Sequence, residues 1–111
     1  MKNLLVIFIL VCLMSCTQKK GLFYWGDYSN TLYDYKKTPN DENLNEHIEA
    51  IQDIIDKSNE KNKKVPPGVY CEYGYLMAKE GNTPEAKKYF ELEANTYPES
   101  ASFMKKLIEN L

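Results

Sequence analysis

The sequence predicts an all-α protein, built from two stacked antiparallel helical hairpins and a C-terminal helix that caps them. Three observations predict this fold class. Apolar residues recur three or four positions apart in several segments, which is the spacing of one helix face. Residue pairs that start or end helices, chiefly Thr-Pro, Gly-Asn and Tyr-Pro, separate these segments. The chain of 111 residues is long enough for one small domain.

The first fifteen residues have the pattern of a secretory signal. Lys2 gives a short positive region, and residues 4–13 form a nearly unbroken apolar run that is too short to span a membrane. Cys16 lies just after this region, and a polar segment begins at Thr17. An ordinary signal peptide cut nearby would leave the cysteine without a role, but its position at the end of the apolar region favours a lipoprotein signal.

Leu13, Ser15 and Cys16 resemble the lipobox of bacterial lipoproteins. In those proteins the cysteine sulfur receives diacylglycerol, and the chain is cut on the amino side of the cysteine. The resemblance implies a signal peptide over residues 1–15, and a Cys16 that carries acyl chains such as palmitate on a short tether over residues 16–22. Each buried CH2 contributes about 0.8 kcal/mol, so a multiply acylated cysteine is an effectively permanent membrane anchor.

The residues after the anchor bear on which membrane carries the protein. Thr17 is not the Asp that retains lipoproteins in the inner membrane of Gram-negative bacteria, so we expect the periplasmic face of the outer membrane. In a Gram-positive cell it would be the cell membrane. The residues from Thr17 to Gly21 reach at most roughly 20 Å. Lys61, Lys63 and Lys64, as well as Lys19 and Lys20, are candidates for contact with anionic lipid. Lys19 and Lys20 are the better candidates because they follow the anchor directly, and a solvated loop is the default expectation for segment 61–64.

The composition argues against several classes of partner. The formal net charge is −2, and the cations are lysines with no arginine. A weakly acidic chain is a poor partner for nucleic acid, and it lacks the side chain that binds phosphate or carboxylate in bidentate fashion. No small-molecule substrate is expected. Cys12 lies within the signal and Cys16 is expected to carry lipid, which leaves Cys71 as a single thiol without an intramolecular disulfide.

The helical domain is expected to span residues 23–111, beginning with a segment rich in aromatic residues. Four residues fall on one face of a helix at 100° per residue: Tyr24, Tyr28, Leu32 and Tyr35. Most of the aromatic side chains are therefore predicted to form the buried stripe of a first helix. Trp25 lies at the margin of this stripe, and Tyr33 points away from it.

A second helix is expected to run to about Asn59. Thr38 is predicted to be its N-terminal cap and Pro39 its first residue, with Asp41 where the acid of a capping box is found. Its apolar positions step by four, three and four residues: Leu44, Ile48, Ile51 and Ile55. Because the connection between the first two helices is short, these apolar faces are expected to pack together in an antiparallel hairpin.

The segment 67–100, PGVYCEYGYLMAKEGNTPEAKKYFELEANTYPES, resembles a tetratricopeptide repeat, a helix-turn-helix unit. The matching positions are Tyr70, Tyr73, Gly74, Met77, Ala86, Phe90 and Pro98. The chain departs from the repeat pattern at Tyr73, which replaces a leucine, and at Glu93, which stands where a small residue is usual. The resemblance implies one clear tetratricopeptide-like repeat here and an irregular hairpin before it.

Individual residues support the helix pair within this segment. Gly74 and Ala86 are small, so two antiparallel helices can approach closely there, and Phe90 fills the space beside them. Gly81-Asn82 is expected to end the first helix, because glycine adopts the left-handed conformation at low cost. Thr83-Pro84 is expected to begin the second helix, with the threonine as cap and the proline in first position.

A last helix is predicted to cover the apolar end of the hairpins, as the ends of stacked repeats require. Tyr97-Pro98 ends the preceding helix, and Ser100 is expected to cap the last one. Its apolar residues recur at helical spacing: Phe103, Met104, Leu107, Ile108 and Leu111.

The tetratricopeptide resemblance also implies a partner-binding groove lined by Cys71, Tyr75, Ala78 and Lys79. Cys71 would then be either a thiol that reacts or bonds with a partner, or a small half-buried side chain. We expect the second, because free cysteine often behaves as a small hydrophobe.

His47 is the single histidine of the chain. No second histidine or carboxylate lies at helical spacing to complete a metal site with it. A catalytic pair with Cys71 would lack an orienting acid and an oxyanion hole. We therefore expect no catalytic residues, no metal and no cofactor, and we expect His47 at the edge of the core or on the surface.

The order of motifs along the chain is a lipobox, YWGDYSNTLYDYKKTP, a long helix, VPPGVY, a Gly-Asn turn and YPES. This order resembles a small family of bacterial repeat-containing lipoproteins of unknown function, which are found alongside an outer-membrane lipoprotein similar to the curli secretion channel. The resemblance implies a role in an envelope assembly. We expect a non-enzymatic, lipid-anchored scaffold that binds a protein partner, for example another lipoprotein. The alternative is glycan or peptidoglycan binding through an exposed aromatic patch of Trp25 and Tyr33.

Overall fold

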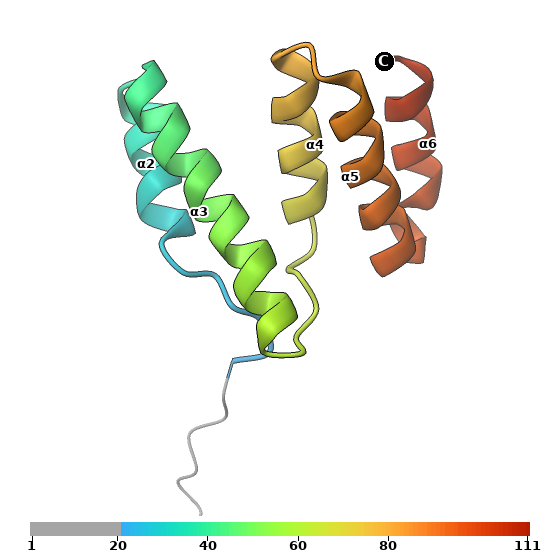
Figure 1. The fold of residues 1–111 in the computed structure, drawn as a ribbon, viewed down its shortest axis with the longest axis horizontal. Coiled ribbons are helices and arrows are strands. Elements are labelled where there is room, and N and C mark those ends of the chain that lie inside the picture. Colours follow the sequence, from blue (N-terminus) through green and yellow to red (C-terminus); the bar gives the residue numbers. More distant parts are fainter. Residues whose placement is uncertain (1–20) are drawn as a thin grey trace, which may run out of the picture.

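Residues 21–111, which the computed structural model describes, form two antiparallel helical hairpins followed by a further helix (Figure 1). The elements in chain order are α2 (Tyr28–Lys37), α3 (Asp41–Glu60), α4 (Val69–Lys79), α5 (Thr83–Thr96), the 3-10 helix η1 (Pro98–Ser100) and α6 (Ala101–Glu109). The predicted all-α class is confirmed, with α2–α3 and α4–α5 as hairpins and α6 as the C-terminal helix. The predicted signal, Cys16 and the lysines that follow it lie outside the described residues.

The two hairpins diverge from each other (Figure 1). α3 and α4 contact each other less than the two helices within either hairpin do. Gly21 lies beside the connection from α3 to α4, because its carbonyl oxygen accepts a hydrogen bond from Lys63 Nζ at 3.0 Å, and the C-terminus lies at the opposite end from this connection (Figure 1). Among residues 21–111, no helix is both long and apolar enough to cross a bilayer.

The first helix begins at Tyr28, so the prediction that Tyr24 belongs to it is wrong. Gly26 has a φ of 49°, in the left-handed region that glycine adopts at low cost, and this turn separates Tyr24 from α2. Tyr24 contacts α3 instead, because its hydroxyl donates a hydrogen bond to Asp53 Oδ2 at 2.8 Å.

The predicted aromatic stripe is half-buried. Tyr28, Leu32 and Tyr35 lie on α2 and remain partly accessible, whereas the buried residue of this helix is Thr31. A threonine is tolerated there because its hydroxyl has a hydrogen-bond partner on α3.

The caps of three helices differ from the predicted ones. Asn40, not Thr38, caps α3: its side-chain oxygen accepts a hydrogen bond at 2.8 Å from the backbone N–H three residues further on. Asn82, not Thr83, caps α5 in the same way, at 3.3 Å. Asparagine is a better cap than threonine, and both pairs of candidates lie close together in the chain. Ser100 precedes α6 but makes no side-chain cap to it.

α3 buries a different face from the predicted one. Its buried residues are His47, Ala50, Ile51, Ile54 and Ser58. Of the predicted stripe, Ile51 is fully buried, whereas Leu44, Ile48 and Ile55 are half-buried against the core. The buried face is rotated because α3 packs against α2 on one side and α4 on the other.

The α4–α5 hairpin packs closely, as predicted. A Cβ atom added at Gly74 would lie 2.9 Å from two ring carbons of Phe90 and 3.1 Å from the backbone oxygen of Ala86. Ala86 and Phe90 are themselves buried. The missing side chain at Gly74 therefore allows α4 and α5 to approach each other.

Glu93, the departure from the repeat pattern, is buried on α5 beside the start of α4. Its Oε1 accepts a hydrogen bond at 2.6 Å from the N–H of Gly68, the N-cap residue of α4. Gly68 has no side chain to cap that helix, so Glu93 supplies the acceptor from α5. The other oxygen, Oε2, has no hydrogen-bond partner among the described residues. Burial raises the pKa of the Glu93 carboxyl, although the Gly68 N–H opposes this effect.

α6 covers α5 over a narrower strip than predicted. Met104 is its buried residue, and Leu107 and Ile108 are half-buried against the core. Phe103 and Leu111, which the spacing placed on the same face, are exposed.

Replacing Gly74 by alanine tests the close approach of α4 and α5. We expect Gly74→Ala to lower the free energy of unfolding by about 1–3 kcal/mol, because the new methyl group overlaps the Phe90 ring. Urea unfolding followed by circular dichroism measures this change. In a double-mutant cycle, Phe90→Leu should make Gly74→Ala less costly. An equal cost in both backgrounds would show that the ring is not the obstacle.

The raised pKa of Glu93 predicts a pH-dependent stability. The folded state favours the protonated carboxyl, so this contribution to stability is present below the ordinary glutamate pKa of about 4.3 and is lost as pH rises through the raised pKa of the folded protein. Glu93→Gln keeps an acceptor for the Gly68 N–H and never ionises. We expect it to unfold at a higher temperature than the parent at about pH 7.5, with a smaller difference at about pH 4.

The exposed Glu91, on the same helix, offers the matched control. Glu91→Gln should leave the pH dependence of the melting temperature unchanged. A difference in stability between Glu93→Gln and the parent that stays the same from about pH 4 to about pH 7.5 would contradict the assignment of a raised pKa to Glu93.

Candidate functional site

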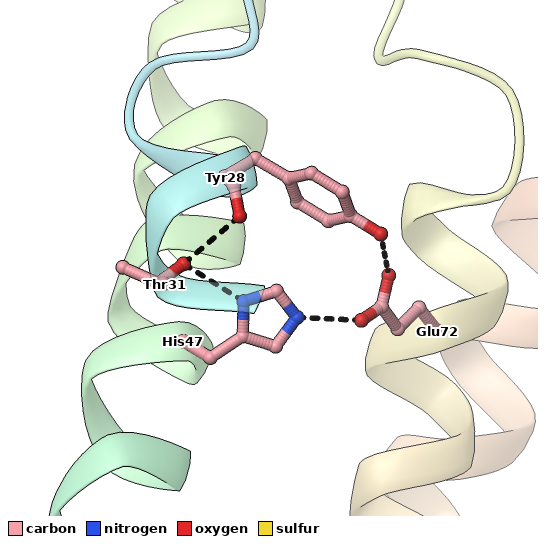
Figure 2. Close-up of polar contacts among 4 residues, drawn as sticks. All are labelled: Tyr28, Thr31, His47 and Glu72. Carbon is pink, nitrogen blue, oxygen red and sulfur yellow. Dashed lines mark hydrogen bonds and ion pairs between the residues drawn. The ribbon is translucent and has the colours of Figure 1, made fainter. Parts of the chain in front are cut away.

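Glu72 on α4 accepts hydrogen bonds from both helices of the first hairpin (Figure 2). The Tyr28 hydroxyl, from α2, donates to Glu72 Oε2 at 2.5 Å. Nε2 of His47, from α3, lies 2.6 Å from Glu72 Oε1. The Thr31 hydroxyl lies 2.8 Å from His47 Nδ1 and 3.2 Å from the Tyr28 carbonyl oxygen. These four residues, which we call the Glu72 network, connect one hairpin to the other.

The hydrogen bonds limit where the protons of the Glu72 network lie. Thr31 has one hydroxyl proton, which goes either to His47 Nδ1 or to the Tyr28 carbonyl. A neutral imidazole protonated on Nε2 donates to Glu72 and accepts from Thr31. An imidazolium donates to both Glu72 and Thr31, and the Thr31 proton then goes to the carbonyl. In both arrangements Glu72 is the acceptor that joins α4 to the first hairpin.

The network is buried at one end and reaches solvent at the other. The His47 side chain is 1% exposed, and the Glu72 side chain is 25% exposed. Burial, and then the hydrogen bond to Glu72, raise the pKa of the Tyr28 hydroxyl far above its usual value, so this group remains a donor. The imidazole also packs against aromatic rings, with centroids 5.1 Å from Tyr28 and 6.5 Å from Tyr35. The surroundings therefore hold His47 in place on several sides.

A pocket of about 280 Å³ lies beside the network, between α2 and α4. We call it the interhairpin groove, and its lining residues are Leu32, Tyr35, Lys36, His47, Glu72, Tyr75, Leu76 and Lys79. Glu72 already uses both oxygens within the network. The groups that remain for a partner are aromatic rings and the ammonium groups of Lys36 and Lys79.

Two of the four residues predicted for a partner groove lie in the interhairpin groove. Tyr75 and Lys79 line it, and the Lys79 ammonium lies 5.5 Å from the centroid of the Tyr75 ring. Cys71 and Ala78 are not among its lining residues and pack half-buried against the core. Burial raises the pKa of the Cys71 thiol, and nearby carboxylates add to the effect. Little thiolate is then present at neutral pH, which favours the interpretation of Cys71 as a small apolar side chain.

The expectation that His47 lies at the edge of the core or on the surface is wrong, because this side chain is among the most deeply buried. Its partners lie 16 residues before it and 25 residues after it, on other helices. No local spacing indicates such partners. One feature of the sequence could have indicated that His47 is buried: His47, Ile51 and Ile54 follow the i, i+4, i+7 spacing of a buried helix face.

Trp25 and Tyr33 are 42% and 63% exposed, in agreement with the predicted exposure of these rings. They have different neighbours. The Trp25 ring packs against Tyr28, with centroids 5.2 Å apart, whereas the Lys37 ammonium lies 5.8 Å from the centroid of Tyr33.

The part of the chain that the structure describes holds no group of three or more His, Cys, Asp or Glu side chains suited to a metal ion. Both ring nitrogens of His47 are engaged within the protein. The Glu72 network is therefore better suited to holding α2, α3 and α4 in position than to transferring protons to a bound molecule.

Residues 22–107 match the family described as a domain of unknown function, DUF4810. The chain belongs to this family. The DUF4810 domain begins one residue before the predicted start of the helical domain, and it includes the Glu72 network and the interhairpin groove. No curated protein and no solved structure matches the chain. This membership agrees with the prediction that the chain belongs to a family of unknown function.

Removing Glu72 tests how much the network contributes to stability. Glu72→Ala leaves the donors of Tyr28 and His47 without their acceptor, so we expect the free energy of unfolding to fall by about 3 kcal/mol. Glu72→Gln keeps one acceptor oxygen, so a smaller loss of about 1–2 kcal/mol is expected. Urea unfolding measures both values. The control is Glu46→Ala at an exposed position of α3, and an effect as large as that of Glu72→Ala would contradict the assignment.

Proposed function

We propose that this DUF4810 protein is a lipid-anchored, non-enzymatic adaptor of the bacterial envelope that binds a protein partner, for example another lipoprotein of an outer-membrane assembly. The observation that carries the proposal is the interhairpin groove, which the Glu72 network borders. The tetratricopeptide-like spacing of residues 67–100 and the lipobox at Cys16 support it. Stacked helical hairpins commonly present surfaces that bind peptides or helices.

The size of the interhairpin groove favours a protein segment over a small molecule. Its volume of about 280 Å³ falls at or below the small end of the range for drug-sized ligands, roughly 300–1,000 Å³. A groove of this size accommodates one or a few side chains of a partner. Tyr75, which is 54% exposed at the groove, is of the residue type that often dominates protein interfaces.

The charge of the groove favours an acidic partner segment. Lys36 and Lys79 are exposed, and the one acidic lining residue, Glu72, is occupied by Tyr28 and His47. We therefore infer that the partner places a carboxylate near the two lysines and an apolar side chain near Tyr75. Because the Glu72 network holds these walls in place, little ordering is needed on binding.

The anchor is tested by substitution of Cys16. The mature protein should fractionate with membranes, and Cys16→Ala should release it or leave the precursor unprocessed. Metabolic labelling with palmitate shows whether the cysteine carries lipid. A Cys16→Ala protein that is processed normally and remains bound to the outer membrane would contradict the anchor.

The groove is tested by crosslinking in intact cells. A photoreactive amino acid that replaces Tyr75 should capture one protein. The same photoreactive amino acid in place of Tyr33, which is also exposed, should not capture that protein. Lys79→Glu should abolish the adduct, because it reverses a charge in the groove. Identical adducts from both positions, or no adduct from Tyr75, would contradict the adaptor proposal.

Glycan or peptidoglycan binding is a second candidate, favoured by the exposure of Trp25 and Tyr33. Asp27, whose Oδ1 accepts a hydrogen bond from Asn30 at 2.7 Å, offers a polar group near the start of α2. If Trp25→Ala or Tyr33→Ala keeps the fold but loses sedimentation with peptidoglycan sacculi, the glycan candidate replaces the adaptor.

A further inference from the structure

The end of the molecule at which Gly21 enters carries lysines that the interhairpin groove does not use. The connection between α3 and α4 contains Lys61, Lys63 and Lys64. Lys63 Nζ donates a hydrogen bond to the Gly21 carbonyl oxygen at 3.0 Å. The basic connection and the N-terminal segment of the described chain are therefore in direct contact, at the end opposite the C-terminus (Figure 1).

Apolar side chains lie among these lysines. Leu22, directly after Gly21, is 77% exposed. A pocket of about 490 Å³ is lined by Leu22, Phe23, Asn62, Lys63, Lys64 and Tyr97. The Lys64 ammonium lies 5.7 Å from the centroid of the Tyr97 ring. This end therefore combines ammonium groups with exposed apolar and aromatic surface.

We propose that this end, formed by Leu22 and by Lys61, Lys63 and Lys64, docks onto a membrane surface that contains anionic phospholipid. Ammonium groups attract the phosphates of such a surface, and an exposed leucine enters the headgroup region. Long lysine side chains can lie along apolar groups while their charges stay at the interface. For the lysine-rich connection the sequence favoured a solvated loop over lipid contact, and its position beside Gly21 and Leu22 now favours lipid contact.

The inference rests on the proposed lipid anchor at Cys16. The residues from Thr17 to Gly21 reach at most roughly 20 Å, so a lipidated cysteine would hold the Gly21 end of the domain near the bilayer. Lys19 and Lys20, which lie outside the described residues, would add positive charge at the same place. Tyr35, Lys36 and Lys79, which line the interhairpin groove, lie near the ends of α2 and α4 that are away from the Gly21 end, so docking leaves this part of the groove accessible to a partner.

The chemistry of this end favours lipid over an acidic protein segment. Leu22 is exposed beside the lysines, and an apolar side chain next to ammonium groups suits the headgroup region of a bilayer. The flexible lysine side chains can adapt to the diffuse charge of an anionic surface. Three lysines fall within four residues at this end, directly after Glu60, whereas the chain as a whole has a net charge of −2.

The test is the acetylation of individual lysines of the mature lipidated protein in vesicles, read by mass spectrometry. One set of vesicles is phosphatidylcholine alone, and the other contains about 30% phosphatidylglycerol. Lys61, Lys63 and Lys64 should be acetylated roughly five-fold more slowly on the anionic vesicles, and salt at about 0.5 M should remove the difference. Lys87 and Lys105, on α5 and α6, are the internal controls and should react equally on both.

Leu22→Ser provides a matched variant, because it removes the exposed apolar side chain without changing the charge. It should reduce the protection of the three lysines, whereas Leu111→Ser, at the opposite end, should not. Equal reactivity of the three lysines on both vesicle types overturns the docking inference. If the three lysines are protected from acetylation in native membranes but not in vesicles of pure lipid, a protein covers this surface. That result also overturns the inference of docking onto lipid.

Flotation of the same samples separates this inference from the proposed anchor. Flotation with both vesicle types supports the anchor, and the acetylation result then decides on docking. Flotation with the anionic vesicles alone refutes the anchor but supports the docking surface. A protein that floats with neither overturns both.

Discussion

Directional hydrogen bonds to α4 are the contacts on which the arrangement of the two hairpins depends, and Glu72 accepts two of them, beside the bond from Gln52 to the Tyr73 hydroxyl. Within each hairpin the helices pack closely, but α3 and α4 contact each other much less. Apolar packing is non-directional, so a small contact of this kind leaves the angle between the hairpins weakly determined. The hydrogen bonds from Tyr28 and His47 to Glu72 are directional and short, at 2.5 and 2.6 Å. They favour one orientation and therefore one shape of the interhairpin groove.

The parts of the fold that follow from neighbouring residues could be predicted from the sequence. Gly81, with a φ of 79°, follows α4 as expected, and the small Gly74 lies against Phe90 because the two helices are joined by a short turn. The helix starts were less predictable, since Asn40 and Asn82 each lie close to a threonine that is also able to cap. The all-α class depends on none of these details.

The candidate site could be predicted only in part, because its residues meet across three helices. The repeat pattern, which positions residues along one helix, suggested Tyr75 and Lys79, and both line the interhairpin groove. Glu72 and His47 are separated by 25 residues, and they become partners only once the hairpins are placed. Period and spacing report the helix face on which a residue lies, but not which polar group of another helix it contacts. Lipid contact by Lys61, Lys63 and Lys64 was considered from the sequence, but their position beside Gly21 could not be predicted, for the same reason.

A distance measurement between the hairpins shows whether Glu72 sets the angle between them. Spin labels at Asn45 on α3 and Lys87 on α5, both exposed, report this distance by pulsed electron resonance in a Cys71→Ser background. We expect a narrow distance distribution with Glu72 present and a broad or shifted one in Glu72→Ala. An unchanged, narrow distribution in Glu72→Ala would contradict the role of Glu72, because apolar packing and the Gln52–Tyr73 hydrogen bond would then be enough to fix the angle.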